Sequence, residues 1–185
     1  MLEEHLVTYC SPTLAALKTA NMFNWNFGSL EEQREQVRDW NRQLSSKGIS
    51  IIVLREGTER ALLYVYRRKR LERDLKKPRV AEFLQQRGYE NLEPEQALER
   101  LKSRFSHTGE FPHEIGLFLG YPLEDVQGFI DNQGKNSTCS GYWKVYGNAA
   151  EALKQFARFE KCRVIYQRLF GQGRGVWQLA VPDSG

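Results

Sequence analysis

Residues 49–66 contain the pattern that most restricts the fold of this chain. Ile49 to Leu54 is a run rich in β-branched residues, and Ala61 to Tyr66 (ALLYVY) is a second run of strand length. The segment between them includes the polar turn Glu56 to Glu59, which contains a glycine. Two such runs joined by a short turn of this kind are typical of an antiparallel β-hairpin. It is the clearest strand signal in the sequence.

A strand and a helix are predicted just before this hairpin. Met22 to Phe27 alternates asparagine with large apolar residues, which favours a strand. Ser29 is a good helix N-cap, and the glutamates that follow it in the first turn suit the helix dipole. The predicted helix carries Val37, Trp40 and Leu44 at helical spacing. It ends at Gly48.

The other segments are mostly helical in pattern. A helix starts at Leu2, and Ser11-Pro12 is expected to stop it after Cys10. The prolines at 112 and 122 suit first helical turns, so a helical hairpin is predicted there. The remaining predictions are a helical region over 67–106, helices over 112–119 and 123–132, a strand over 141–146, a long amphipathic helix over 149–170, and a last strand over 176–181.

These elements predict a single α+β domain over residues 1–185, with 67–106 as a candidate protruding helical subdomain. Its expected architecture is a small antiparallel or mixed sheet packed with several helices, among them the helical hairpin and the long C-terminal helix. The sequence shows no internal repeat and no low-complexity linker. A chain of 185 residues is long enough to bury one substantial core.

Charge and cysteine content favour a cytoplasmic protein. The net charge is +4, from 27 basic and 23 acidic residues, which describes a mixed surface more than a nucleic-acid footprint. The first residues are acidic where a signal peptide is basic, and no apolar run reaches the roughly 20 residues that span a bilayer. Three widely spaced cysteines, at 10, 139 and 162, suit free thiols. Cys162 shares an apolar helical stripe and is expected in the core.

The helical hairpin has the outline of a helix-turn-helix, but its second helix is poorly suited to DNA. The face opposite its apolar stripe carries Glu124, Asp125 and Asp131 without a lysine or arginine. A recognition helix lies against phosphates and base edges and needs positive charge and donors. We therefore expect a hairpin that packs on the sheet.

Polar groups at the ends of predicted elements form a candidate ligand site. His113 and Glu114 follow Pro112 in an expected first helical turn, where free amides and the helix dipole favour an anionic group. Cys139 lies in a loop of small polar residues that could approach a ligand closely. The candidate ligand-binding residues are Cys10, Lys18, Asn21, His113, Glu114 and Cys139. No pair has the spacing of a zinc site, so no metal is predicted.

A basic segment gives a second interpretation. Residues 67–79 hold eight basic and two acidic residues, and Tyr64 and Tyr66 precede them on one strand face. Aromatic and basic side chains on a sheet can stack and hold single-stranded nucleic acid. The alternative site therefore comprises Tyr64, Tyr66, Arg67, Arg68 and Arg70. The competing explanation is a solvated helix whose basic side chains cover the edge of the core.

Three segments carry a family resemblance. YCSPTLAALKTAN lies near the start, HEIGLFLGYPLEDVQGFI lies in the middle, and GYWKVYG is followed later by FARFEKC. The chain resembles a family of small uncharacterised proteins of anaerobic bacteria, known as a domain of unknown function. The resemblance covers most of the chain and implies a stand-alone cytosolic domain. It supplies no activity and no functional residues.

The leading hypothesis is a cytosolic protein that binds a small ligand or cofactor, in redox or metal-related metabolism. The first alternative is a nucleic-acid-binding module that uses the basic segment. The second alternative is a protein-interaction adaptor without catalysis. The sequence leaves open the cofactor, the oligomeric state and whether the protein is an enzyme.

Overall fold

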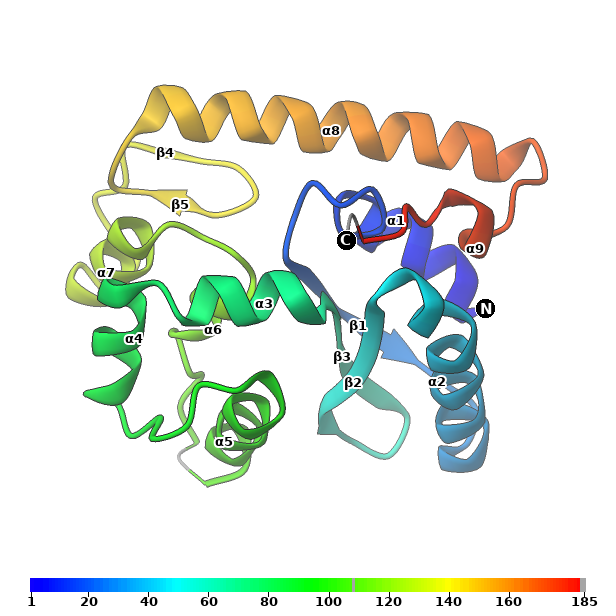
Figure 1. Cartoon of the computed structure of the whole chain (residues 1–185), viewed down its shortest axis with the longest axis horizontal. Coiled ribbons are helices and arrows are strands. Elements are labelled where there is room, and N and C mark those ends of the chain that lie inside the picture. Colours follow the sequence, from blue (N-terminus) through cyan, green and yellow to red (C-terminus); the bar gives the residue numbers. More distant parts are fainter. Residues whose placement is uncertain (108, 184–185) are drawn as a thin grey trace. The chain divides into compact units, whose positions relative to one another are not determined.

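The computed structural model describes residues 1–107 and 109–183 (Figure 1). The chain divides into two compact units, Met1–Leu71 with Cys162–Gly185 (unit 1) and Glu72–Lys161 (unit 2). The expected α+β class is confirmed: the described elements include a three-stranded antiparallel sheet, a two-stranded sheet and a long helix near the C-terminus. No helix among the described residues is long and apolar enough to cross a membrane.

Unit 1 is built around the predicted hairpin. β2 (Ile49–Glu56) and β3 (Arg60–Arg67) pair antiparallel, and β1 (Ala20–Asn26) adds to the other edge of β3, which gives the order β1-β3-β2. A register shift between Val53 and Arg55 interrupts the β2–β3 ladder. Both the hairpin and the preceding strand are thus confirmed.

One face of this sheet carries the core of unit 1. The helices that pack there are α1 (Leu2–Leu14), α2 (Leu30–Leu44) and the short α9 (Val176–Leu179), and the turn η1 (Ser45–Lys47) follows α2. Ser29 caps α2 as expected, because its side chain accepts a hydrogen bond from the Glu32 amide. Burial of apolar area is the main stabilising term for such a layer. The buried sheet residues are Phe23, Trp25, Ile49, Ile51, Ala61, Leu63 and Val65.

Two predictions for unit 1 are wrong. α1 continues to Leu14, although Ser11-Pro12 was expected to end it. A proline near the last turn removes a single hydrogen bond, and Leu14 gains burial by staying helical. The expected strand over 176–181 is the helix α9 followed by irregular chain. Its buried Val176 and Leu179 fit a helical turn as well as a strand, because short apolar runs do not distinguish the two.

Unit 2 is mainly helical. α4 (Pro78–Gln85), α5 (Pro94–His107), α6 (Ile115–Phe118) and α7 (Leu123–Asp131) lie within it, and β4 (Cys139–Ser140) pairs with β5 (Lys144–Val145). α3 (Arg68–Leu75) and α8 (Ala149–Gly171) contribute residues to both units. The long helix matches its prediction closely. The predicted strand over 141–146 is shorter than expected and is reduced to β5.

A buried carboxylate connects α7 to the small sheet. Asp125 Oδ1 accepts hydrogen bonds from the backbone amides of Tyr146 and Gly147, each at 2.8 Å. Its other oxygen accepts from the indole nitrogen of Trp143, also at 2.8 Å. Charged acceptors form the stronger class of hydrogen bond. The acidic face of the helical hairpin is therefore partly an internal contact surface, which agrees with the argument against DNA reading.

Candidate functional site

Three of the predicted ligand-binding residues, Cys10, Lys18 and Asn21, are buried in unit 1. The Thr13 hydroxyl donates to Asn21 Oδ1 at 2.7 Å, and Lys18 Nζ donates to the carbonyl oxygen of Ala20 at 2.5 Å. These polar groups have protein partners. They stabilise the turn between α1 and β1.

Burial shifts the pKa values of the Cys10 thiol and the Lys18 amine. It raises the pKa of Cys10 well above the ordinary value, with nearby Lys18 opposing the shift weakly. It lowers the pKa of Lys18 from 10.5 to about 7, and Cys10 partly offsets this. Desolvation disfavours whichever form is charged, so both shifts have one cause. Cys10 is consequently a protonated thiol at neutral pH, which is unsuited to nucleophilic chemistry.

The other three predicted residues, His113, Glu114 and Cys139, belong to unit 2. The His113 ring packs beside Phe111 and Phe129, with centroids 5.8 and 5.0 Å away. Cys139 is partly buried in β4, opposite Val145. The expected first helical turn is wrong: α6 begins only at Ile115 and has four residues. His113 and Glu114 therefore precede the helix, and the anion-site argument does not apply to them.

The six predicted residues thus fall into two sets, one in each unit. The convergence of Cys10, His113 and Cys139 on one ligand stays a prediction. Within the described ranges, no group of three His, Cys, Asp or Glu residues is arranged to hold a metal ion.

The alternative nucleic-acid residues are largely internal. Tyr64 and Tyr66 are buried, and their rings stack with centroids 5.1 Å apart. Arg70 donates to the carbonyl oxygens of Ala16 and Leu17, and Arg68 is exposed. Bases stack on exposed rings, so the two tyrosines as placed do not form a base-stacking platform.

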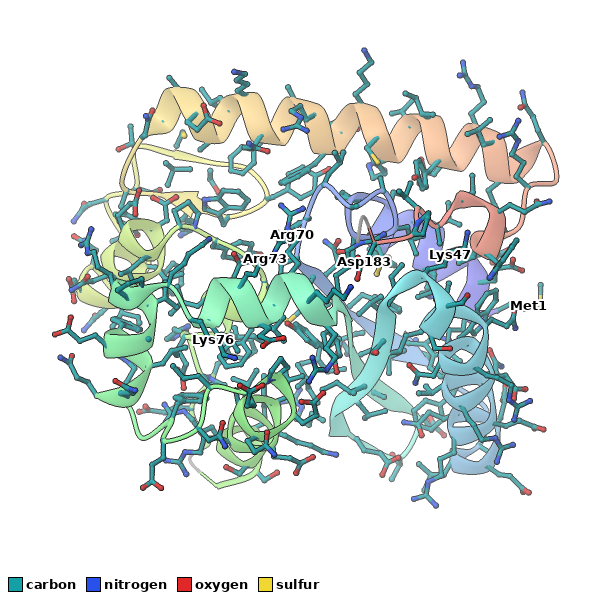
Figure 2. All side chains as sticks on the ribbon, viewed as in Figure 1. Met1, Lys47, Arg70, Arg73, Lys76 and Asp183 are labelled. Carbon is teal, nitrogen blue, oxygen red and sulfur yellow. The ribbon has the colours of Figure 1, made fainter. Side chains whose placement is uncertain are left out.

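Arg67 is the most fully bonded side chain of this set. It is 1% exposed, and every N–H of its guanidinium has an acceptor. These donors hold together the end of α1, the turn after α2 and the C-terminal segment. Figure 2 labels two of the residues that accept from them, Lys47 and Asp183. The acceptors are the carbonyl oxygens of Thr13, Leu14, Lys47 and Val181 and the carboxylate of Asp183.

Glu114 is likewise committed to internal contacts. It is 3% exposed, accepts a hydrogen bond from the Tyr89 hydroxyl at 2.9 Å, and forms an ion pair with Arg104 on α5. Burial, and then the charge and hydrogen bond of Glu114, raise the pKa of Tyr89, so its hydroxyl stays a donor. The cluster fixes the chain around residue 89 to α5.

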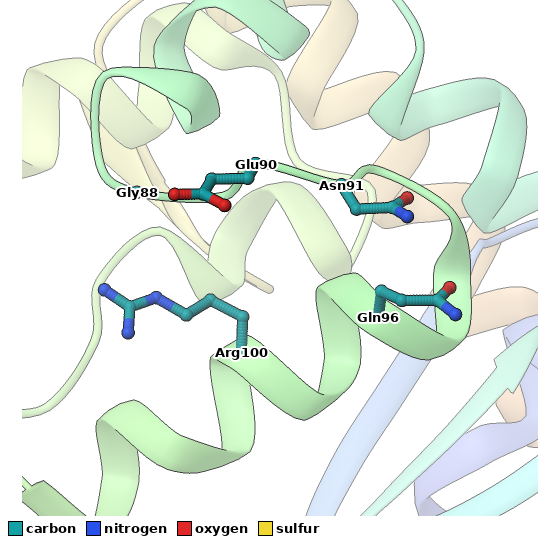
Figure 3. A pocket seen from close by; sticks show the side chains of 5 residues that line it. All are labelled: Gly88, Glu90, Asn91, Gln96 and Arg100. Atoms are coloured by element: carbon teal, nitrogen blue, oxygen red, sulfur yellow. The ribbon is translucent and has the colours of Figure 1, made fainter.

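A pocket of about 430 Å³ is lined by the residues on either side of Tyr89 (Figure 3). Its lining comes from the loop after α4 and from the first turns of α5. Gly88 has φ +84°, and a Cβ there would lie 3.0 Å from a terminal nitrogen of Arg100. Glycine therefore suits both the left-handed backbone and the space beside the guanidinium. The lining residues are Gly88, Glu90, Asn91, Gln96 and Arg100.

The five lining residues are exposed, and most of their side-chain polar groups have no partner in the described part of the chain. There, neither the Arg100 guanidinium nor the Glu90 carboxylate forms an ion pair or a hydrogen bond. The Asn91 carbonyl oxygen accepts from the Glu93 amide at 2.8 Å, which leaves the NH₂ group as a donor. Sequence reasoning missed the pocket because its residues match no motif. The available signal was Gln96 and Arg100, one turn apart on a predicted helix after a glycine-containing loop.

Comparison with known proteins matches the chain to one family model. A family model described as "Protein of unknown function (DUF3793)" matches residues 6–180. The chain belongs to this family. The match spans nearly all of the sequence and agrees with the resemblance seen in the three segments. Neither a curated protein nor a solved structure matches the chain.

Proposed function

We propose that this DUF3793 protein binds a small molecule with an anionic group, such as a carboxylate, in the pocket of unit 2. The observation that supports this most is the exposed Arg100 guanidinium, which lines an open pocket of about 430 Å³ and has no protein partner in the described residues. Pockets for small ligands commonly measure roughly 300–1,000 Å³ and place a few polar groups for orientation.

Two arginines on α5, Arg100 and Arg104, have different surroundings. Arg104, one turn further along, pairs with the buried Glu114. That carboxylate is also bonded to Tyr89. Arg100 is exposed and lines the pocket. A guanidinium presents a planar fork of donors that matches a carboxylate with two parallel hydrogen bonds.

The pocket also offers neutral donors. The Asn91 amide is fixed by its bond to the Glu93 backbone, and Gln96 projects from the first turns of α5 (Figure 3). The proposal keeps the small-ligand hypothesis from the sequence. It moves the site from Cys10, His113 and Cys139 to the exposed side chains that line this pocket.

Titration of the ¹⁵N-labelled protein with glutarate, glutamine and the neutral analogue glutaramide tests the proposal. The two carboxylate compounds should shift the amide resonances of residues 88–100, and glutaramide should not. Arg100→Gln should abolish these shifts. Lys102→Gln removes the same charge from an exposed position on α5 outside the pocket lining and should preserve them. Absence of binding by both carboxylates, or binding unchanged in Arg100→Gln, would refute the proposed function.

A further inference from the structure

The two charged side chains of the pocket lie at the same end of it. Figure 3 shows the Glu90 carboxylate next to Gly88, on the side toward which the Arg100 guanidinium extends. The charges are opposite but are not joined in an ion pair, although they line one pocket. A ligand group at this end therefore meets one negative and one positive protein charge.

This pair of charges discriminates between types of anion. A simple carboxylate at Arg100 gains an ion pair but also lies near the negative Glu90, and like charges repel. A ligand that carries an ammonium group beside its carboxylate removes this repulsion, because the ammonium can donate to Glu90. An α-amino acid has both groups on one carbon, so it can satisfy both side chains at the same end.

The other end of the pocket is neutral and polar. The amide groups of Asn91 and Gln96 extend away from the charged end in Figure 3. Amides supply donors and acceptors together and suit a ligand amide or hydroxyl. A polar ligand side chain can hydrogen-bond to these exposed amides and an aliphatic one cannot, so a polar side chain is preferred.

We infer that the ligand is a free α-amino acid with a polar side chain, with its carboxylate on Arg100, its ammonium on Glu90 and its side chain between Asn91 and Gln96. The inference rests on the proposed function and specifies its ligand class. It goes further in one respect: it assigns Glu90 an attractive role, whereas binding of any carboxylate needs only Arg100.

Isothermal titration of the full chain with four compounds tests this assignment. Glutamine is the reference, N-acetylglutamine lacks the ammonium, glutaminamide lacks the α-carboxylate, and leucine lacks the polar side chain. Glutamine should bind at least about fivefold more tightly than each of the other three, the size of effect expected when one charged or polar contact is lost. Glu90→Gln should bring N-acetylglutamine and glutamine to equal affinity. Glu99→Gln, an exposed charge on α5 outside the lining, should leave the preference intact.

The outcomes separate the inference from the proposed function. If N-acetylglutamine binds as tightly as glutamine, or if Glu90→Gln leaves the preference unchanged, the amino-acid assignment is wrong and carboxylate binding at Arg100 still stands. If leucine matches glutamine, the polar-side-chain part is wrong. If no carboxylate compound binds, both the inference and the proposed function are wrong.

Discussion

The Tyr89 hydroxyl donates a hydrogen bond of 2.9 Å to the buried carboxylate of Glu114. Tyr89 stands between Gly88 and Glu90, two residues that line the pocket. Glu114, a candidate ligand-binding residue from the sequence, thus accepts a hydrogen bond from the residue between two that line the pocket. The same carboxylate pairs with Arg104. It thus connects the pocket loop to α5, the helix that carries Arg100.

Replacement of Glu114 by alanine should therefore destabilise unit 2. The change leaves the Tyr89 hydroxyl and part of the Arg104 guanidinium without their acceptor, which should cost roughly 2–4 kcal/mol of unfolding free energy. Tyr89→Phe removes only the hydroxyl and should cost about 1 kcal/mol. Urea unfolding followed by circular dichroism measures both. Equal stability of Glu114→Ala and the wild type would show that this cluster does not hold the loop.

Gly88→Ala should impair ligand binding more than its effect on folding suggests. A non-glycine residue at φ +84° is strained by about 1 kcal/mol, and the added Cβ would press on the Arg100 guanidinium. Carboxylate affinity and thermal stability, measured on the same preparation, separate the two effects. Gly109→Ala has a positive φ of +63° and no heavy atom within 4 Å of its Cβ, so it provides the matched control for backbone strain. Equal affinities for the two variants would contradict this prediction.

Arg67→Lys should destabilise unit 1 although it keeps the charge. An ammonium cannot reach all the acceptors that the guanidinium holds, so buried carbonyl groups lose their donors. The expected cost is roughly 2–4 kcal/mol. Asp183→Asn removes only the partly exposed carboxylate and should cost about 1 kcal/mol or less. Chemical unfolding of both variants is the measurement, and the reverse ranking would contradict the assignment of Arg67 as the central donor.

Lys18 should make stability rise with pH just above neutrality. Its pKa is about 7 in the folded protein and has the ordinary value of 10.5 in the unfolded chain. Between these values the unfolded chain binds the extra proton, so the unfolding free energy increases with pH, by up to about 1.4 kcal/mol per pH unit. Lys18→Met should flatten this slope in urea unfolding between about pH 7.5 and 8.5. An unchanged slope in Lys18→Met would contradict the role of Lys18 in this pH dependence.

Cys10 sets the upper limit of that pH window. Its pKa is raised in the folded state from an ordinary value of 9.0, so above this value the unfolded thiol ionises first and stability falls. The Lys18 measurement is therefore made below pH 9. Cys10→Ala should leave the slope below pH 9 in place, which separates the two titrations.

Asp125→Asn should loosen the small sheet of unit 2. Asparagine keeps the size of the side chain but turns one acceptor into a donor, which would face either backbone amides or the Trp143 indole. The expected loss is roughly 2–3 kcal/mol, with a change in tryptophan fluorescence. Asp131→Asn changes an exposed carboxylate on the same helix and should have little effect. Similar losses in the two variants would contradict the assigned role of Asp125.

Local sequence patterns predicted the elements that carry strong periodicity. The hairpin of β2 and β3, the Ser29 cap of α2 and the long helix α8 were all expected. Errors fell on short segments and on the end of α1. Residues 176–181 were expected as a strand and contain α9, and α6 starts three residues after Pro112. In such segments, burial decides between conformations that the local pattern leaves nearly equal.

The sequence by itself determined the α+β class, which follows from patterns of neighbouring residues, and the low net charge of +4, which follows from composition. The partners of individual polar side chains were decided by the tertiary structure. Arg67 bonds to residues more than 100 positions away, and Glu114 bonds to Tyr89 across an intervening helix. Buried polar groups need hydrogen-bond partners, and folding brings these partners from distant parts of the chain. The spacing of residues in the sequence does not show which of them will meet. Of two arginines one turn apart on α5, Arg104 pairs with the buried Glu114 and Arg100 is exposed, a difference that their spacing in the sequence does not show.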